Sequence, residues 1–104
     1  VYIDQNNGYD AFFAKFNSDG DTIFFKQYPD PDYSWPLQFQ NTDSKELIVL
    51  SGKKVNSDDQ LSKYIIWKYD TTGARSVIYE ANYEMHYARK IFKYENYIYV
   101  GGEI

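Results

Sequence analysis

Two clusters of aromatic and polar side chains are the part of this sequence best suited to binding a ligand. They are Asp30, Asp32, Tyr33 and Trp35 in the first cluster, and Tyr83 and His86 in the second. Aromatic rings beside carboxylates can stack on a sugar ring and hydrogen-bond its hydroxyl groups. The clusters therefore predict a carbohydrate-binding surface. The alternative is that Trp35 packs between sheets and that the aspartates are solvated loop residues.

Other reactive patterns are weaker. His86 is the single histidine, and no nucleophile motif accompanies it, so a surface or interface histidine is expected rather than a general base. The segment 17–21 is rich in carboxylates, but an EF-hand register on Gly20 would put Lys15 and Lys26 at ligand positions, which favours a turn. The chain contains no Cys, which excludes disulfides and thiolate metal sites. We expect no catalysis, no metal and no cofactor.

Composition narrows the class of protein. The chain has 104 residues, enough for one small domain or two repeat units. Its net charge is -4, which disfavours nucleic acid as a partner. The 12 Tyr and 7 Phe suit pleated, half-buried surfaces. No apolar run approaches the length of a membrane span, and no signal peptide is recognisable.

The sequence repeats itself, and the repeats must position these clusters. Residues 11–28 resemble residues 64–81, at a distance of 53 positions, with Gly20 and Gly73 at the same place in a polar turn. Residues 46–52 resemble residues 96–102, at a distance of 50 positions. Self-similarity at this period is typical of repeat architectures.

Short apolar runs between turn signals predict strands and no helix. The run 51–62 is polar and is expected to form an exposed loop, with Asp58 and Asp59 at its tip, while Trp35 falls in the loop between the second and third strands. Eight strands are expected, at residues 11–17, 22–28, 37–41, 47–50, 64–70, 75–80, 88–94 and 97–102.

The hairpin at residues 10–28 resembles the repeats of a family of bacterial β-propellers. The positions that match the repeat pattern are Asp10, Ala11, Ala14, Lys15, Asp19, Gly20, Phe24, Lys26 and Tyr28, with Phe24 standing where the repeat has Trp. The second copy keeps Lys68, Asp70 and Gly73. The ending of residues 98–102 is similar to the end of an inner hairpin in the same family.

The resemblance implies an all-β fold of antiparallel four-stranded β-propeller blades. If the strands of a blade are named A to D from the axis outward, the chain reads C-D-A-B-C-D-A-B. Residues 1–32 are then a half-blade, 33–82 a full blade and 83–104 a second half-blade. The D-to-A loops, which hold both clusters, would share one face of the propeller.

Two blade equivalents cannot close a ring, so further blades are expected as partners. They would come from the same longer chain, of which these residues would be a segment, or from identical copies. The expected function is a non-catalytic interaction or scaffold module of an exported bacterial protein, located at the cell surface, in the medium or in the periplasm. The alternative is a lectin-like propeller. A protein or a glycan would be the ligand, with no nucleic acid and no membrane span involved.

Overall fold

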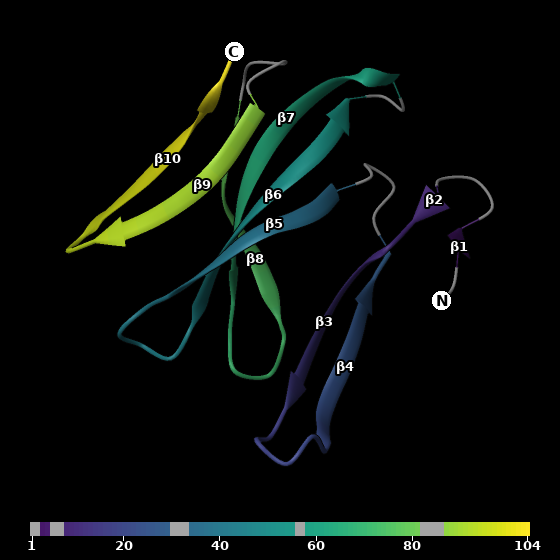
Figure 1. Ribbon diagram of the computed structural model, residues 1–104, viewed down its shortest axis with the longest axis vertical. Helices are drawn as coiled ribbons and strands as arrows, with labels where there is room; N and C mark the ends of the chain where they lie inside the picture. Colours follow the sequence, from purple (N-terminus) through teal and green to yellow (C-terminus); the bar gives the residue numbers. More distant parts are fainter. Residues whose placement is uncertain (1–2, 5–7, 30–33, 56–57, 82–86) are drawn as a thin grey trace.

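The fold consists of β-strands throughout the part of the chain that can be described. A computed structural model describes residues 3–4, 8–29, 34–55, 58–81 and 87–104 (Figure 1). All strand pairs in these ranges are antiparallel, which confirms the predicted all-β fold. The strands are β1 (Ile3–Asp4), β2 (Gly8–Tyr9), β3 (Ala11–Phe16), β4 (Thr22–Tyr28), β5 (Ser34–Asn41), β6 (Leu47–Val55), β7 (Asp58–Tyr69), β8 (Arg75–Glu80), β9 (Tyr87–Tyr94) and β10 (Tyr97–Glu103).

The eight longer strands form three open sheets. β5, β6, β7 and β8 make a four-stranded sheet in sequence order, β3 and β4 make one hairpin, and β9 and β10 make another. The short strands β1 and β2 pair only with each other. The four-stranded sheet lies between the two hairpins (Figure 1). Eight strands were predicted, and they correspond to β3–β10.

An aliphatic core joins the four-stranded sheet to the β9–β10 hairpin. Ile48 and Leu50 of β6, Ile66 of β7 and Ile91 of β9 form one buried cluster. The backbone N–H of Ile91 also donates a hydrogen bond of 2.7 Å to the side-chain carbonyl of Gln38 in β5. Burying these side chains removes apolar area from water, which is the main favourable term in folding.

Aromatic rings and a cation join the other face of the sheet to the β3–β4 hairpin. The ring of Phe13 lies 4.7 Å from the ring of Tyr69, centroid to centroid. The guanidinium of Arg75 lies over two rings, 4.2 Å from Tyr28 and 4.0 Å from Trp67. Such cation–π contacts contribute roughly 0.5–2 kcal/mol each. The two faces of the sheet are therefore held by different interactions.

Two of the turns have the same hydrogen bonds. In turns 17–21 and 70–74, a side-chain oxygen of the first residue accepts bonds from the backbone N–H groups of the third and fifth residues. The distances are 2.9 Å in the first turn, and 2.8 and 3.1 Å in the second. The fourth residue, Gly20 or Gly73, has a positive φ. These matching turns support the predicted 53-residue repeat.

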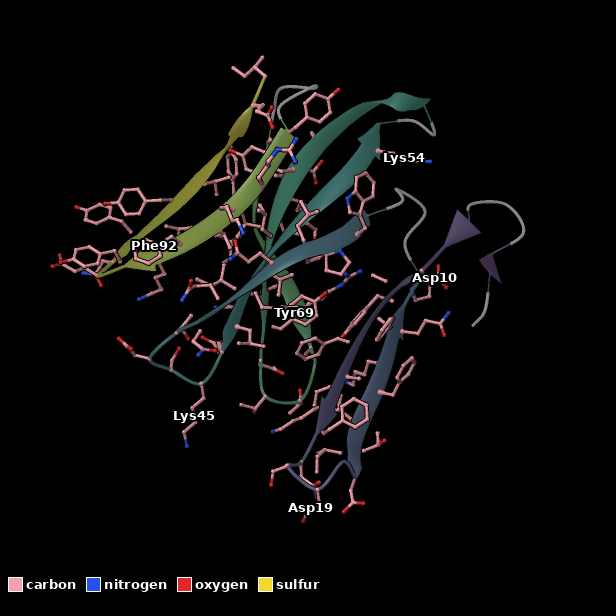
Figure 2. The ribbon with its side chains drawn as sticks, viewed as in Figure 1. Asp10, Asp19, Lys45, Lys54, Tyr69 and Phe92 are labelled. Carbon is pink, nitrogen blue, oxygen red and sulfur yellow. The ribbon has the colours of Figure 1, made fainter. Side chains whose placement is uncertain are left out.

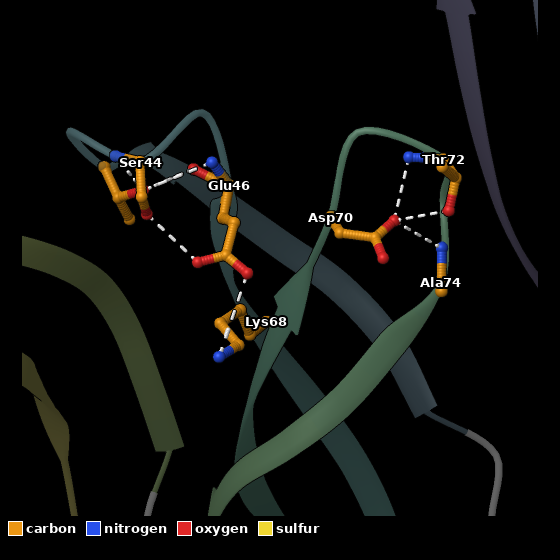
Figure 3. Close-up of polar contacts among 7 residues, drawn as sticks. Ser44, Glu46, Lys68, Asp70, Thr72 and Ala74 are labelled. Atoms are coloured by element: carbon orange, nitrogen blue, oxygen red, sulfur yellow. Dashed lines mark hydrogen bonds and ion pairs between the residues drawn. The ribbon is translucent and has the colours of Figure 1, made fainter.

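The turn between β5 and β6 is a third version of this design. The hydroxyl oxygen of Thr42 accepts bonds from the N–H groups of Ser44 and Glu46 (Figure 3). The position of the glycine is taken by Lys45, which has a φ of 64°. A residue with a Cβ is strained in this left-handed region. The turn therefore carries a local cost that the other two turns avoid.

The prediction of an exposed loop over residues 51–62 is wrong. β6 continues to Val55 and β7 begins at Asp58, so most of the segment belongs to paired strands. Its polar composition suggested a loop, but the ladder uses backbone groups that every residue except Pro supplies. Lys53 and Lys63 lie directly opposite each other in this extension. Glu80 pairs with both lysines, at 3.2 and 2.6 Å, and so offsets their repulsion.

The prediction that Trp35 lies in a loop is also wrong. β5 begins at Ser34, and Trp35 pairs with Gly52 of β6. The strand also contains Pro36, although proline cannot donate a ladder hydrogen bond. β5 is an edge strand, and the register shifts between Pro36 and Gln38, so the proline sits at a bulge. Both circumstances are ones in which a strand tolerates proline.

The repeat of residues 46–52 in residues 96–102 is displaced by one position in the structure. In β5–β6, the bulged Leu37 lies opposite residues 50–51. In β9–β10, the bulged Arg89 lies opposite residues 101–102. Matching the two bulges relates β6 to β10 at a distance of 51 positions, whereas matching the glycines predicted 50. The glycines are therefore misleading as markers of register.

The faces of the strands agree with the displacement of 51. It matches Leu47 with Ile98, and Val49 with Val100. Leu47 lines the side of the sheet that faces the β3–β4 hairpin, and Ile98 and Val100 face the four-stranded sheet. Each of these side chains thus points to the sheet that precedes it in the chain. A shift of one residue would exchange the two faces.

Replacing Lys45 by Gly is expected to stabilise the protein. The substitution relieves a left-handed residue with a Cβ, so the free energy of unfolding should rise by about 1 kcal/mol. Urea unfolding followed by circular dichroism measures the change. Lys45→Ala is the matched control, because it removes the same side chain and keeps the Cβ. Equal effects of the two substitutions would show that the strain at Lys45 is negligible.

Candidate functional site

Only one of the six predicted ligand-binding residues can be located. Asp30, Asp32, Tyr33, Tyr83 and His86 lie outside the described residues, so the two predicted clusters stay predictions. Trp35 is described, near the start of β5. The neighbourhood of Trp35 is therefore the first candidate site.

The indole of Trp35 lies flat over a glycine. A Cβ at Gly52 would come within 2.5 Å of the ring, closer than real carbon atoms approach. The absence of a side chain at Gly52 is what allows the ring to cross the neighbouring strand at this place. The side chain of Trp35 remains 38% exposed. It therefore offers an aromatic surface that is fixed on one side and open on another.

A shallow groove of about 220 Å³ adjoins this ring. It runs between the four-stranded sheet and β9, and Lys63, Tyr87 and Arg89 contribute to its walls. Arg89 forms an ion pair with Glu103 across β9 and β10. The groove combines the aromatic rings of Trp35 and Tyr87 with two cations, Lys63 and Arg89. A flat polar ligand could stack and hydrogen-bond here.

Glu80 binds two of the neighbouring cations. Its carboxylate accepts hydrogen bonds from Lys63 and Lys53, and both bonds lower the pKa of Glu80 below its usual value. The bond from Lys63 has the larger effect on this pKa, and burial opposes the shift. The geometry fits a structural role, because Lys53 and Lys63 are cross-strand neighbours of like charge.

Asp70 is held by its turn in a similar way. Hydrogen bonds from the hydroxyl and the backbone N–H of Thr72, and from the N–H of Ala74, lower the pKa of Asp70 (Figure 3). Lys68 and Glu46 lie beside this turn as an ion pair at 3.8 Å. The carboxylates of Asp70 and Glu46 therefore interact with other groups of the same chain.

A larger hollow lies elsewhere, between the β3–β4 hairpin and the four-stranded sheet. It is an open groove of about 700 Å³ with mainly apolar walls. Phe13 and Phe24 line it from the hairpin, and Phe39 and Leu47 line it from the sheet. Phe39 is 49% exposed there. Beside the groove, the hydroxyl of Tyr28 donates a hydrogen bond to a backbone carbonyl, and burial raises the pKa of this tyrosine.

Each hairpin also has an outer face of exposed aromatic and aliphatic side chains. Their exposed fractions lie between 54 and 64%. Figure 2 shows Phe92 on β9, far from Tyr69, which marks the junction of the sheet with the β3–β4 hairpin. The residues are Phe12, Phe16, Ile23 and Phe25 on the β3–β4 outer face, and Phe92, Tyr94, Tyr97 and Tyr99 on the β9–β10 outer face. Phe12 and Phe16 also line the 700 Å³ groove, which extends along β3.

Sequence reasoning missed the 700 Å³ groove. A signal was available, because strands 11–16 and 97–100 carry apolar residues at both odd and even positions. This pattern is expected for strands that are covered on both faces. Such a pattern predicts burial. It does not say which of the two sides has a cover within the same chain.

No match was found when the chain was compared with protein-family models, with curated proteins and with solved structures. In the described ranges, no three residues among His, Cys, Asp and Glu are grouped so that they could hold a metal ion. The same ranges contain no helix of the length and hydrophobicity needed to cross a membrane.

Replacing Glu80 by Gln is expected to weaken the fold in a pH-dependent way. The folded pKa of Glu80 lies below its ordinary value of 4.5, so its stabilising effect is present above that pH and is lost as the pH falls through the folded value. Near neutral pH, the loss should be about 1 kcal/mol or less, because the carboxylate is partly exposed.

Urea unfolding of the wild type and the variant, at pH values from about 3 to 7, tests this expectation. Glu103→Gln is the control, because the Arg89–Glu103 pair is exposed on both sides and should contribute little. A Glu80→Gln effect that stays constant over this pH range would contradict the assignment.

Proposed function

We propose that the chain is a non-catalytic interaction or scaffold module built from β-propeller blades. One observation carries the proposal: the four-stranded sheet is covered on both faces by hairpins that each expose a further apolar face. Because both outer hairpin faces are apolar, a further sheet can pack on each end of this stack. Blades that pack face to face around an axis are the arrangement that ends such a stack without exposed faces.

The connectivity of the sheets supports the same proposal. The complete sheet runs β5-β6-β7-β8 in sequence order. The matching turns make the β3–β4 hairpin an equivalent of β7–β8, and the matching bulges make β9–β10 an equivalent of β5–β6. One hairpin is thus the outer half of a blade, and the other is the inner half.

The roles of the charged residues favour a scaffold over an enzyme. Asp70 caps its own turn, Glu80 neutralises two lysines, and Arg75 stacks between Tyr28 and Trp67. Each of these groups has an evident use in holding strands together. The assignment to an exported bacterial protein at the cell surface or beyond rests on the resemblance of residues 10–28 alone.

A single polypeptide with three copies of the chain, joined by short linkers, tests the propeller proposal. Three copies supply about six blades, within the usual range for a closed propeller. We expect a monomeric particle that unfolds cooperatively and shows a central hole by electron microscopy. A string of independent units in small-angle X-ray scattering would contradict the proposal.

A lectin-like function is the second candidate, because the exposed ring of Trp35 lies beside two cations in a groove. Titration with simple sugars, followed by tryptophan fluorescence, tests it. If the scaffold proposal is right, no saturating change that depends on Trp35 is expected. Trp35→Phe is the control, with Trp67 as the reference fluorophore in both proteins. A saturating response in the wild type that this variant loses would favour the lectin.

A further inference from the structure

The two faces of the four-stranded sheet are covered unequally. On one face, the backbone of β9 approaches β5, β6 and β7. On the other face, the backbone of β3 approaches only β5 among the strands of the sheet. The 700 Å³ groove lies on this second face, next to Phe39 and Leu47. On the first face, the β9–β10 hairpin covers the strands of the sheet. No hairpin among the described residues occupies the equivalent position on the second face.

The unpaired edges of the two hairpins also indicate that a neighbouring hairpin is missing. β6 pairs with β7 inside the complete sheet. Its equivalent β10 pairs only with β9, and the equivalent of β7, which is β3, pairs only with β4. An unpaired edge offers a row of free backbone donors and acceptors to another strand. β10 and β3 are therefore complementary edges, but they lie on opposite sides of the sheet (Figure 1).

We propose that a second copy of this chain fills the groove with its β9–β10 hairpin and pairs its β10 with β3. The inference rests on the proposed function, and it names identical copies as the source of the further blades. The four-stranded blade formed at the junction would contain β9 and β10 of one copy and β3 and β4 of the next.

The existing sheet gives the register of this junction. Val49 pairs with Trp67, and Leu47 pairs with Tyr69. The displacements of 51 and 53 positions carry these pairs to Val100 opposite Ala14, and to Ile98 opposite Phe16. The same register puts the small residues 101–102 opposite the bulky residues 12–13. Bulk on one strand is thus matched by space on the other.

The junction also covers both outer faces. The β9–β10 outer face would lie against Phe39 and Leu47 of the next copy, inside the groove. The β3–β4 outer face would lie over the outer strands of the preceding copy's four-stranded sheet, where Tyr79 is exposed. A second copy therefore buries three exposed apolar surfaces at once. The contact is head to tail, so copies either close into a ring or continue as a filament.

Cysteine cross-linking tests the register, and the chain has no native Cys to interfere. Ala14→Cys and Val100→Cys variants are mixed and oxidised, and disulfide-linked pairs are measured on non-reducing gels. The Cα atoms of opposite residues in an antiparallel pair are about 4.5–5.5 Å apart, which lies within the roughly 4.4–6.8 Å that a disulfide spans. The expected result is a linked pair in the mixture and none in either variant alone.

Phe12→Cys mixed with Val100→Cys is the matched control, because it lies on the same face two residues out of register. Diagonal neighbours are about 7–8 Å apart, too far for a disulfide without movement. We expect at least about a tenfold lower rate of linkage. Equal rates for the two mixtures would overturn the proposed register.

Light scattering on the unmodified chain provides an independent test. The proposal expects the mass of two or more chains of 12.3 kDa each. Tyr99→Lys should lower the mass to that of a single chain, because it puts a charge into the buried face, whereas Tyr99→Phe should preserve the assembly. A wild-type mass of one chain would overturn the proposal.

The outcomes separate this inference from the propeller proposal. A single-chain mass shows that separate copies do not associate, but the three-copy polypeptide still tests the propeller, because its linkers raise the effective concentration of neighbouring copies. Specific cross-links in an open filament would instead support the strand pairing and contradict the propeller.

Discussion

The structure depends on burying both sides of one central strand. Ile48 and Leu50 project from one face of β6, and Leu47 and Val49 from the other. Val49 and Leu50 are both fully buried, although they point in opposite directions. A strand of this kind is stable only when each face of its sheet has a cover. The two hairpins are those covers, and each of them then presents a new apolar face that requires a cover in turn.

The two covers are chemically different. The β9–β10 hairpin meets the sheet through aliphatic side chains and one hydrogen bond to Gln38. The β3–β4 hairpin meets it through Phe13, Tyr28 and the cation of Arg75. The open groove lies on the side that is held by these aromatic and cationic contacts. The larger of the two grooves, about 700 Å³ against about 220 Å³, is thus on the aromatic side.

Much of the fold could be predicted from local signals. Turn residues such as Asn17, Asp70 and their glycines marked two hairpins correctly, because their side chains bond to the turn itself. Residues 51–62 and Trp35 were misjudged, because a paired backbone can carry a polar sequence and an edge strand can carry proline. The register of β10 required the bulge at Arg89, which no sequence pattern announces.

The candidate sites were less predictable than the strands. Of the predicted ligand-binding residues, Trp35 could be located, and its ring lies over Gly52. This contact joins neighbouring strands, and the spacing of residues in the sequence does not predict it. The groove at Phe39 depends on how far apart two sheets stand, which is a property of tertiary packing.

The turn between β9 and β10 differs in length from its counterpart between β5 and β6. Five residues separate Asn41 from Leu47, whereas four separate their equivalents Lys93 and Ile98. The difference of one residue leaves the bulge and the alternation of faces in place in both hairpins. Related copies of this unit are therefore free to gain or lose residues at this end of the strands, and sequence divergence between duplicated units should accumulate there first.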